Sequence, residues 1–350
     1  MNLRQLADSL GLSMTTVSRA LNGYPEVREE TRARVLAAAK AANYTPNARA
    51  RRLATGRAMT IGHVVPLTGR EETVNPIFSD FLAGAGEVYA REGYDLLLSM
   101  VAAEAIDDTY RNLAATGSVD GVMVQSPRVE DHRISLLQDL KMPFLVHGRT
   151  GDYGAYSWLD IANIRAFRRA TEFLLDLGHR RIALINGQET LDFAARRRKG
   201  MEEALATRGV TTQPDWVHQG VMTEQYGFTT TRTLLADPVP PTAIMCSSII
   251  PAMGARRAIA EAGLVLGRDV SIICHDDELS YLGNDALTSP AGPPFTATRS
   301  SIRAAGATLC RDADRPDPCA RPAAVARALG NRTVTGPLDR PRPRGIRTPA

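Results

Sequence analysis

Two short amphipathic helices joined by a glycine turn are predicted at the amino terminus, and this segment constrains the fold of the chain most. Apolar residues recur at helical spacing between Leu3 and Leu10, which predicts a helix with one apolar stripe. Gly11 should end that helix, and Ser13 can cap a second one directly after it. A third apolar-periodic segment at residues 29–42 can close a three-helix core.

The second helix should bury Val17, Ala20 and Leu21 and leave polar side chains on its other face. An arginine there can donate two hydrogen bonds to a guanine edge, whereas hydroxyl groups bond phosphates. A helix of this kind is suited to entering the major groove of DNA with its amino-terminal end. The residues predicted to face outward are Met14, Thr15, Ser18 and Arg19.

An arginine-rich segment, PNARARRLATGR at residues 46–57, follows the third helix, for which Val35, Leu36 and Ala39 are the expected core positions. Arginines that flank a small apolar wedge are typical of minor-groove contacts. Residues 1–58 contain ten Lys or Arg against four Asp or Glu, a net charge of +6, whereas the whole chain carries +4. The positive charge is therefore concentrated where phosphates would be met.

The helix-turn-helix segment, the third helix and the arginine-rich segment together resemble the lactose-repressor (LacI/GalR) family, through the runs LADSLGLSMTTVSRALNG, VREETRARV and NYTPNARARRLA. The resemblance implies a helix-turn-helix headpiece at residues 1–45 and a hinge helix at 46–58, and it implies double-stranded operator DNA as the partner of a homodimer. A purely structural helical hairpin is the alternative for a helix-turn-helix pattern taken alone. The residues to which the resemblance assigns DNA contacts are Met14, Thr15 and Arg19 on base edges, Ser13, Thr16, Ser18 and Asn22 on phosphates, and Leu53 as the minor-groove wedge. The hinge segment adds Asn47, Ala50, Arg51 and Ala54 as predicted DNA contacts, with Arg51 expected on a phosphate.

The composition excludes several classes of protein. A chain of 350 residues with 44% hydrophobic residues can form a headpiece plus one large two-lobed domain or two medium ones. No stretch approaches the roughly 20 apolar residues of a membrane span, and no cleavable leader precedes Leu3, so a cytoplasmic protein is expected.

Motifs of catalysis and cofactor binding are absent from the sequence. There is no P-loop, GxGxxG or serine nucleophile elbow, so neither catalytic residues nor a cofactor are predicted. The cysteines form no CxxC pair and have no histidine at zinc-finger spacing, so they are expected to be reduced thiols without a metal. They are Cys246, Cys274, Cys310 and Cys319.

Residues 59–306 alternate short apolar runs with helical segments, which predicts an α/β fold of two doubly wound parallel-sheet lobes. The family resemblance extends here through NPIFSDFLAGAGEVYAREGYDLLL and GHRRIALING, and it implies a sugar-responsive, periplasmic-binding-protein-like sensor. Strands are expected within 61–66, 94–101, 120–125, 142–148, 180–187, 242–248 and 270–277, and helices within 78–91, 107–115, 163–177, 196–208 and 252–262.

Open parallel sheets bind ligands at the carboxyl ends of their strands, so loop residues there are the effector candidates. By resemblance, Phe78 stacks on a sugar ring and Arg197 bonds two adjacent hydroxyls, although Phe78 can instead be a core residue. Residues 196–199 are four successive cations, which are often a solvated face. Arg149 and Asp160 are further candidates in the polar segments between the lobes.

An acidic pair follows the last predicted strand. By resemblance, Asp276 accepts bonds from vicinal hydroxyls, with Asp277 as its structural neighbour. Either residue can instead be a turn or capping aspartate, Asp277 more readily than Asp276. The sequence departs from the family at Cys274-His275 and at Ser247-Ser248, of which Ser248 keeps hydrogen-bonding capacity. A metal site or a glycosidase carboxylate pair at His275-Asp276-Asp277 is disfavoured because successive residues of a strand point in opposite directions.

The tail, residues 307–350, has an aberrant composition: nine arginines and seven prolines but no lysine or glutamate. One synonymous codon choice for residues 307–317, shifted by one base, reads RRFAEMLIDP and would continue the preceding amphipathic helix. A frameshift near Ala307 is therefore hypothesised, with a basic disordered extension as the alternative.

The sequence thus predicts a sugar-responsive transcriptional repressor of carbohydrate genes, and RAMTIGHVVP, YSWLDI and FTATRSSIRAAG resemble regulators of α-glucoside use. Two alternatives remain open: a sugar-binding transport module that does not bind DNA, and a glycosidase on a related two-lobed scaffold.

Overall fold

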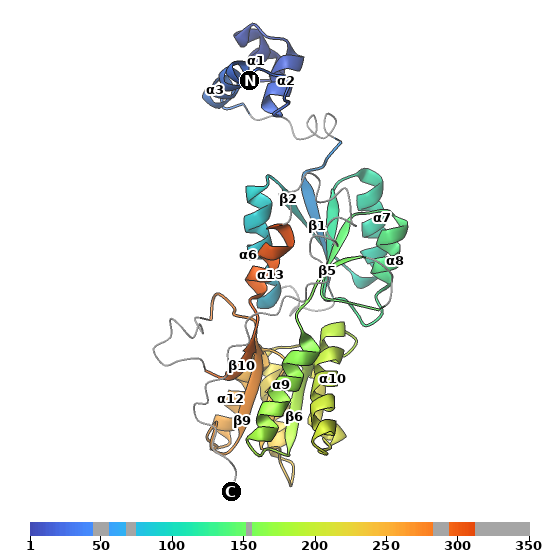
Figure 1. Ribbon diagram of the computed structural model, residues 1–350, viewed down its shortest axis with the longest axis vertical. Coiled ribbons are helices and arrows are strands. Elements are labelled where there is room, and N and C mark those ends of the chain that lie inside the picture. Colours follow the sequence, from blue (N-terminus) through green and yellow to red (C-terminus); the bar gives the residue numbers. More distant parts are fainter. Residues whose placement is uncertain (45–55, 68–74, 152–155, 283–293, 312–350) are drawn as a thin grey trace. The chain divides into compact units, whose positions relative to one another are not determined.

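A computed structural model describes residues 1–44, 56–67, 75–151, 156–282 and 294–311 (Figure 1). The chain divides into two compact units, Met1–Met59 with Gly117–Val119, and Thr60–Thr116 with Asp120–Ala350. The first unit contains the headpiece and the second contains both α/β lobes.

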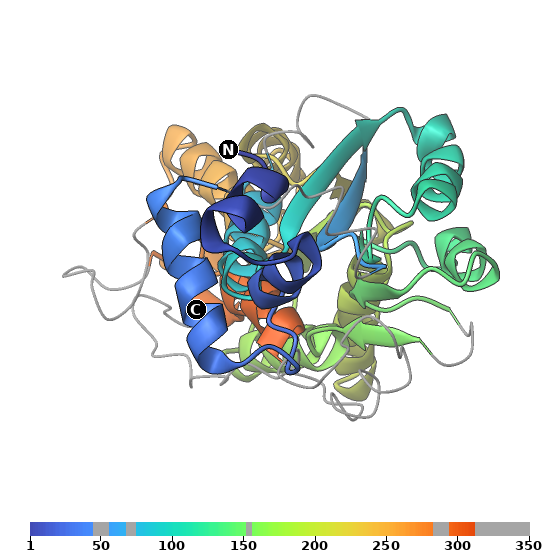
Figure 2. The ribbon, with the colours of Figure 1, turned by 90° about the horizontal axis from the view of Figure 1, so that it is seen from above.

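The headpiece is the predicted bundle of three helices, drawn in blue in Figures 1 and 2. Gly11 ends the first helix in the left-handed conformation, with φ 63°, which a residue with a Cβ adopts only under strain. The Ser13 side chain caps the second helix by accepting a hydrogen bond from the Thr16 amide at 3.0 Å. The helices are α1 (Leu3–Leu10), α2 (Met14–Leu21) and α3 (Glu29–Ala41).

The headpiece core confirms most of the expected apolar positions, but Leu21, expected to be buried, is only partly buried against it. Leu36 was expected in the core, but its side chain is 48% exposed. Val27, which lies between α2 and α3, is buried and contributes to the core in addition to the predicted residues. The buried core residues are Leu6, Ala7, Val17, Ala20, Val27, Val35 and Ala39.

The first lobe is a parallel sheet in the order β2-β1-β3-β4-β5, with α6 on one face and α7 and α8 on the other (Figure 1). Strands β1 and β3 are mostly buried, as expected of a parallel sheet covered on both sides. The strands are β1 (Thr60–Pro66), β2 (Asp95–Val101), β3 (Gly121–Gln125), β4 (Phe144–His147) and β5 (Ser157–Leu159). The helices are α6 (Pro76–Arg91), a short 3-10 turn η1 (Ala103–Ala105), α7 (Ile106–Thr116) and α8 (His132–Asp139).

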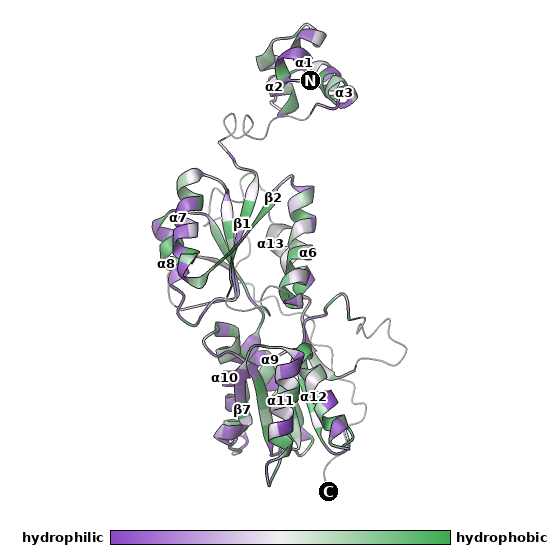
Figure 3. Ribbon diagram, turned by 180° about the vertical axis from the view of Figure 1, so that it is seen from behind, coloured by the Kyte–Doolittle hydropathy of each residue, from purple (hydrophilic) through white to green (hydrophobic). Residues whose placement is uncertain are grey.

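The second lobe repeats this arrangement in the strand order β10-β9-β8-β6-β7, also parallel throughout. Every residue of β6, β8 and β9 is buried, and Figure 3 shows the predominantly hydrophobic colour of these central strands. The strands are β6 (Ile182–Gly187), β7 (Val217–Gly220), β8 (Ala243–Cys246), β9 (Ser271–Asp276) and β10 (Thr296–Arg299). The helices are α9 (Asn163–Asp176), α10 (Asp192–Thr207), η2 (Pro214–Trp216), α11 (Glu224–Leu235) and α12 (Ile249–Glu261).

The last described helix, α13 (Ile302–Arg311), returns the chain to the first lobe and packs against α6 (Figure 1). The two backbones touch: a Cβ on Gly84 would lie 2.0 Å from the Arg303 carbonyl oxygen, and one on Gly306 would lie 2.2 Å from that of Phe81. Only glycine permits this approach at either position. The helix continues to Arg311, past the predicted boundary at residue 306, and the frameshift hypothesis stays a prediction because residues 312–350 lie outside the described part.

Several elements escaped the sequence-based prediction. The segments that form α8, α11, β5, β7 and β10 were not assigned, and α10 begins at Asp192 rather than Arg196. Helix α11 contains a run of threonines, which favour strands, and it is held by close packing on α12, where a Cβ on Gly254 would lie 1.9 Å from the Glu224 carbonyl oxygen. Tertiary packing thus overrides local propensity there.

Helices of membrane-spanning length and apolarity do not occur within the described ranges. Cys246 and Cys274 are buried free thiols at neighbouring positions of β8 and β9. Among the residues with described positions, no group of three or more His, Cys, Asp or Glu side chains could hold a metal ion.

Candidate DNA-binding and effector sites

The outward face of α2 carries the residues predicted to read DNA. Met14 is 50% exposed, Thr15 and Arg19 are exposed, and Ser18 is half-buried. The Arg19 side chain makes no hydrogen bond or ion pair with any described residue, so its guanidinium is available to an external partner. We call Met14, Thr15, Ser18 and Arg19 the recognition face.

The residues predicted to bind phosphates surround this face and are partly occupied within the headpiece. Ser13 Oγ lies 2.8 Å from Thr16 Oγ1, and Asn22 Nδ2 donates to the Ser18 carbonyl oxygen at 2.8 Å. These bonds fix the two ends of α2, and a hydroxyl retains further bonding capacity. The predicted hinge contacts lie outside the described residues: Asn47, Ala50, Arg51, Leu53 and Ala54.

The carboxyl ends of the strands in the second lobe bring several effector candidates to one edge. Ile185, Cys246 and Cys274 are at the same level in β6, β8 and β9. The residues that follow them, including Ser247 and His275, therefore emerge side by side. This edge is where open parallel sheets bind ligands.

Arg197 is buried at this edge, 5% exposed, on the inner face of α10. Its Nε donates to Asn163 Oδ1 at 2.8 Å, and its Nη1 donates to the Ser247 carbonyl oxygen. The guanidinium also lies over the rings of Phe167 and Phe193, with its carbon 5.3 and 4.9 Å from their centroids. Burial lowers the pKa of Arg197 to about 10, against the opposing effect of nearby carboxylates, so it remains charged at neutral pH.

Asp277 is one of two buried carboxylates, with Asp160, whose charge acts on Arg197. Its Oδ2 lies 3.5 Å from Ser248 Oγ, and its Oδ1 lies 3.5 Å from His275 Nε2. Burial raises the pKa of Asp277 to about 7, and the charge of Arg197 acts in the opposite direction. Ser248 also caps α12, because its Oγ accepts from the Ile250 amide at 3.3 Å.

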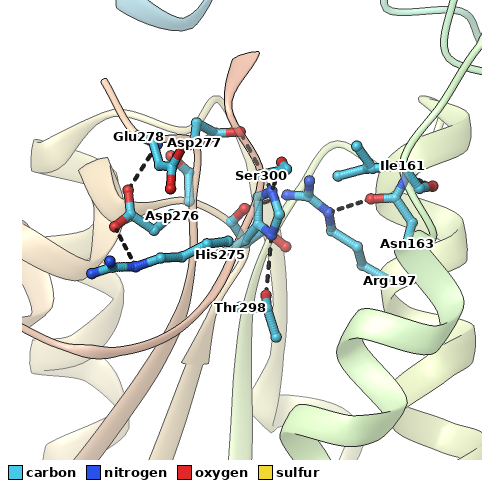
Figure 4. A network of polar contacts seen from close by, with 12 residues as sticks. Ile161, Asn163, Arg197, His275, Asp276, Asp277, Glu278, Thr298 and Ser300 are labelled. Atoms are coloured by element: carbon cyan, nitrogen blue, oxygen red, sulfur yellow. Dashed lines mark hydrogen bonds and ion pairs between the residues drawn. The ribbon is translucent and has the colours of Figure 1, made fainter. Parts of the chain in front are cut away.

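The Asp276 carboxylate bonds the backbone of Glu278, as Figure 4 shows. Its Oδ1 accepts from the Glu278 amide at 2.9 Å, and its Oδ2 lies 3.4 Å from Arg299 Nε. Successive side chains of an extended segment face opposite sides, and the charge of Asp277, not that of Asp276, acts on Arg197. The role of Asp276 as a sugar ligand stays a prediction.

Arg149 and Asp160 form an ion pair at the passage between the lobes. Arg149 Nε lies 2.9 Å from Asp160 Oδ2, and its guanidinium lies 4.8 Å from the centre of the Trp158 ring. Asp160 Oδ1 accepts from the Ile161 amide and from Asn163 Nδ2. Burial raises the pKa of Asp160, and its pairing with Arg149 opposes that shift.

Phe78 is half-buried in the first turn of α6, whose cap is Asn75. Its stacking on a sugar stays a prediction. Two residues that sequence reasoning did not select, Asn163 and His275, belong to the polar cluster (Figure 4). His275 Nδ1 lies 3.1 Å from Thr298 Oγ1 and Nε2 lies 2.9 Å from Ser300 Oγ, so it joins β9 to β10.

Comparison with known proteins places both units in known families. Residues 2–47 match the bacterial regulatory proteins of the lacI family, and residues 171–328 match the periplasmic binding protein-like domain. The chain is 47% identical to the HTH-type transcriptional regulator AglR of Rhizobium meliloti (strain 1021) over 312 residues, which cover 89% of this chain and 86% of AglR.

Solved structures agree with this assignment. The lac repressor dimer bound to operator and the anti-inducer ONPF matches with a TM-score of 0.72 and 27% identity, over 89% of this chain and 91% of that one. The complex of the transcriptional regulator CelR with cellobiose matches with a TM-score of 0.62 and 26% identity, over 89% and 91%. The glycosidase and transport-module alternatives are thereby set aside, because the relatives are DNA-binding regulators. The chain belongs to the lacI family of bacterial regulatory proteins and is a transcriptional regulator, not an enzyme.

Proposed function

We propose that this protein is a homodimeric repressor of carbohydrate uptake and utilisation genes that responds to an α-glucoside. The observation that carries the proposal is the presence, in one chain, of an exposed recognition face on α2 and of a buried Arg197–Asp277 cluster at a sheet edge suited to a polar ligand. The α-glucoside assignment is supported by the resemblance of the sequence to regulators of α-glucoside use and by its identity with AglR. Because such a regulator acts on chromosomal DNA, we place it in the cytoplasm.

In the proposed effector site, Arg197 donates two hydrogen bonds to adjacent hydroxyls, and Asp277 and Ser248 accept or exchange bonds with others. Arginine donates to the oxygen of a hydroxyl and a carboxylate accepts its hydrogen, so together they satisfy both bonding capacities of vicinal hydroxyls. Phe78, Arg149, Asp160 and Asp276 remain further proposed contacts, with the Arg149–Asp160 pair closing the side of the site nearer the first lobe.

The dimer is proposed to use the outer edge of the first sheet. Leu96, Leu98 and Met100 alternate along the edge strand β2 and are 40%, 38% and 38% exposed. An exposed apolar row on an edge strand is a liability unless another chain covers it. Dimerisation would supply that cover and bring two headpieces to the half-sites of a pseudo-palindromic operator.

The proposal is tested with purified protein and a sugar panel of maltose, trehalose, sucrose and, as a β-linked control, cellobiose. At least one α-glucoside is expected to raise the melting temperature and to change the affinity for upstream promoter DNA by about 10-fold, within the usual range of allosteric coupling. A protein that binds promoter DNA equally with and without every sugar would contradict the proposed effector class.

A further inference from the structure

The side-chain amide of Asn163, the first residue of α9, bonds at both ends. Its Oδ1 accepts from Arg197 Nε at 2.8 Å, and its Nδ2 donates to Asp160 Oδ1 at 3.1 Å. These partners determine the orientation of the amide, because an arginine can only donate and a carboxylate can only accept. The side chain is 2% exposed, so both bonds are shielded from water.

These bonds are part of a continuous chain of four side chains, which we call the Asn163 relay: Arg149, Asp160, Asn163 and Arg197. Arg149 follows β4 of the first lobe and bonds Asp160 Oδ2 at 2.9 Å, whereas Arg197 lies on α10 of the second lobe. Asn163 lies where the chain passes from β5 of the first sheet to α9 of the second lobe. The relay therefore runs along the passage between the lobes and ends at Arg197 of the proposed effector site.

Because the relay is buried, movement of one side chain should strain the hydrogen bonds of its neighbours. Asp160 and Arg197 are each 5% exposed, and hydrogen bonds in a water-poor interior polarise and constrain one another. If a ligand pulls the Arg197 guanidinium, Asn163 must follow or lose its bond, and Asp160 with Arg149 must adjust in turn. Only a side chain that both accepts and donates can occupy the position of Asn163 without breaking one side of the relay.

We propose that Asn163 is a positioning residue that couples Arg197 to Arg149, so that effector binding in the second lobe is transmitted through this amide to the first lobe. The inference rests on the proposed function, since it concerns regulation by the same site. Asn163 itself does not contact the sugar in this scheme.

Two substitutions separate the two ends of the amide. Asn163→Asp keeps an acceptor for Arg197 but loses the donor to Asp160 and places a second carboxylate beside it. Asn163→Ala removes both bonds. Asn112→Asp, the same chemical change at an exposed position of α7, is the matched control.

The measurements are sugar affinity by calorimetry and operator affinity with and without the responding disaccharide of the panel. Asn163→Asp is expected to bind sugar within about threefold of the wild type but to lose most of the sugar-dependent change in operator affinity, about 10-fold in the wild type. Asn163→Ala is expected to lose sugar affinity as well, by about 10-fold, because Arg197 keeps only its bond to the Ser247 carbonyl oxygen. Wild-type coupling in Asn163→Asp, or equal loss of sugar binding in both variants, overturns the inference.

A second measurement needs no sugar and so distinguishes failure of the inference from failure of the proposed effector. The melting-temperature shifts of Arg149→Ala and Arg197→Met are expected to be non-additive by about 2 °C or more when combined in the wild-type background. They should become additive in Asn163→Asp. Additive shifts in the wild type would overturn the relay whether or not a sugar responds.

Discussion

Replacing Arg19 by alanine is expected to weaken operator binding by about 1–3 kcal/mol, roughly 5-fold to 150-fold, and to relax the sequence preference at one base pair. The reason is that the Arg19 side chain is exposed on the recognition face and bonds no described residue, so its removal should lose the base contact with little effect on headpiece stability. The measurement is fluorescence anisotropy with an operator and its single-base variants.

Arg51→Ala is the comparison for this prediction, since the predicted phosphate contact should weaken binding to all sequences alike and lower the salt slope by about one. If Arg19→Ala binds every base variant in the same rank order and ratio as the wild type, the recognition face is misassigned.

Replacing Arg197 by methionine is expected to lower sugar affinity by about 100-fold or more, because two charge-assisted bonds of the guanidinium to the ligand are lost. Operator affinity in the absence of sugar should remain close to that of the wild type, since the headpiece is a separate compact unit. Calorimetry gives the first quantity and anisotropy the second.

Arg168→Met provides the control for a lost arginine on an adjacent helix. Arg168 is exposed on α9, and its only described ion pair is with Glu172 at 3.8 Å, so sugar binding should persist. A circular dichroism melt shows whether each variant is folded. A folded Arg197→Met protein with wild-type sugar affinity would remove Arg197 from the effector site.

Elements with strong periodicity or continuous apolar runs were predictable from the sequence. The headpiece helices and strands such as β6 and β9 match the expected segments closely, because their pattern and burial agree. The sheet edges were not predictable: β5 has three residues, and β7 and β10 have four, too few to show a period. Leu36 shows the opposite failure, since an apolar residue at helical spacing is exposed.

The start of α10 explains why the cation run at residues 196–199 was ambiguous. Because the helix begins at Asp192, Arg196 can pair with it at i,i+4, and Arg198 pairs with Glu189 and Glu202 at the surface. Arg197 points inward from the same run. The same run thus contains both solvated cations and one buried ligand candidate. Which cation is buried depends on how α10 is rotated about its axis against the sheet.

The acidic pair posed a similar problem. Family resemblance selects Asp276, and the strand alternation says only that Asp276 and Asp277 face opposite ways. The absolute phase depends on how β9 pairs with β8 and β10, which is a property of the tertiary structure. Asn163 could not be found at all from local pattern, because its two partners lie 34 residues away and 3 residues before it.

The most direct test of the account is the salt dependence of binding by the wild-type protein to duplex promoter DNA from upstream of neighbouring carbohydrate genes. The account predicts tight, sequence-preferring binding whose logarithm falls linearly with the logarithm of salt concentration, with a slope of about −0.9 for each phosphate neutralised. Affinity that is absent at low salt, or that does not change as salt is added, would contradict it.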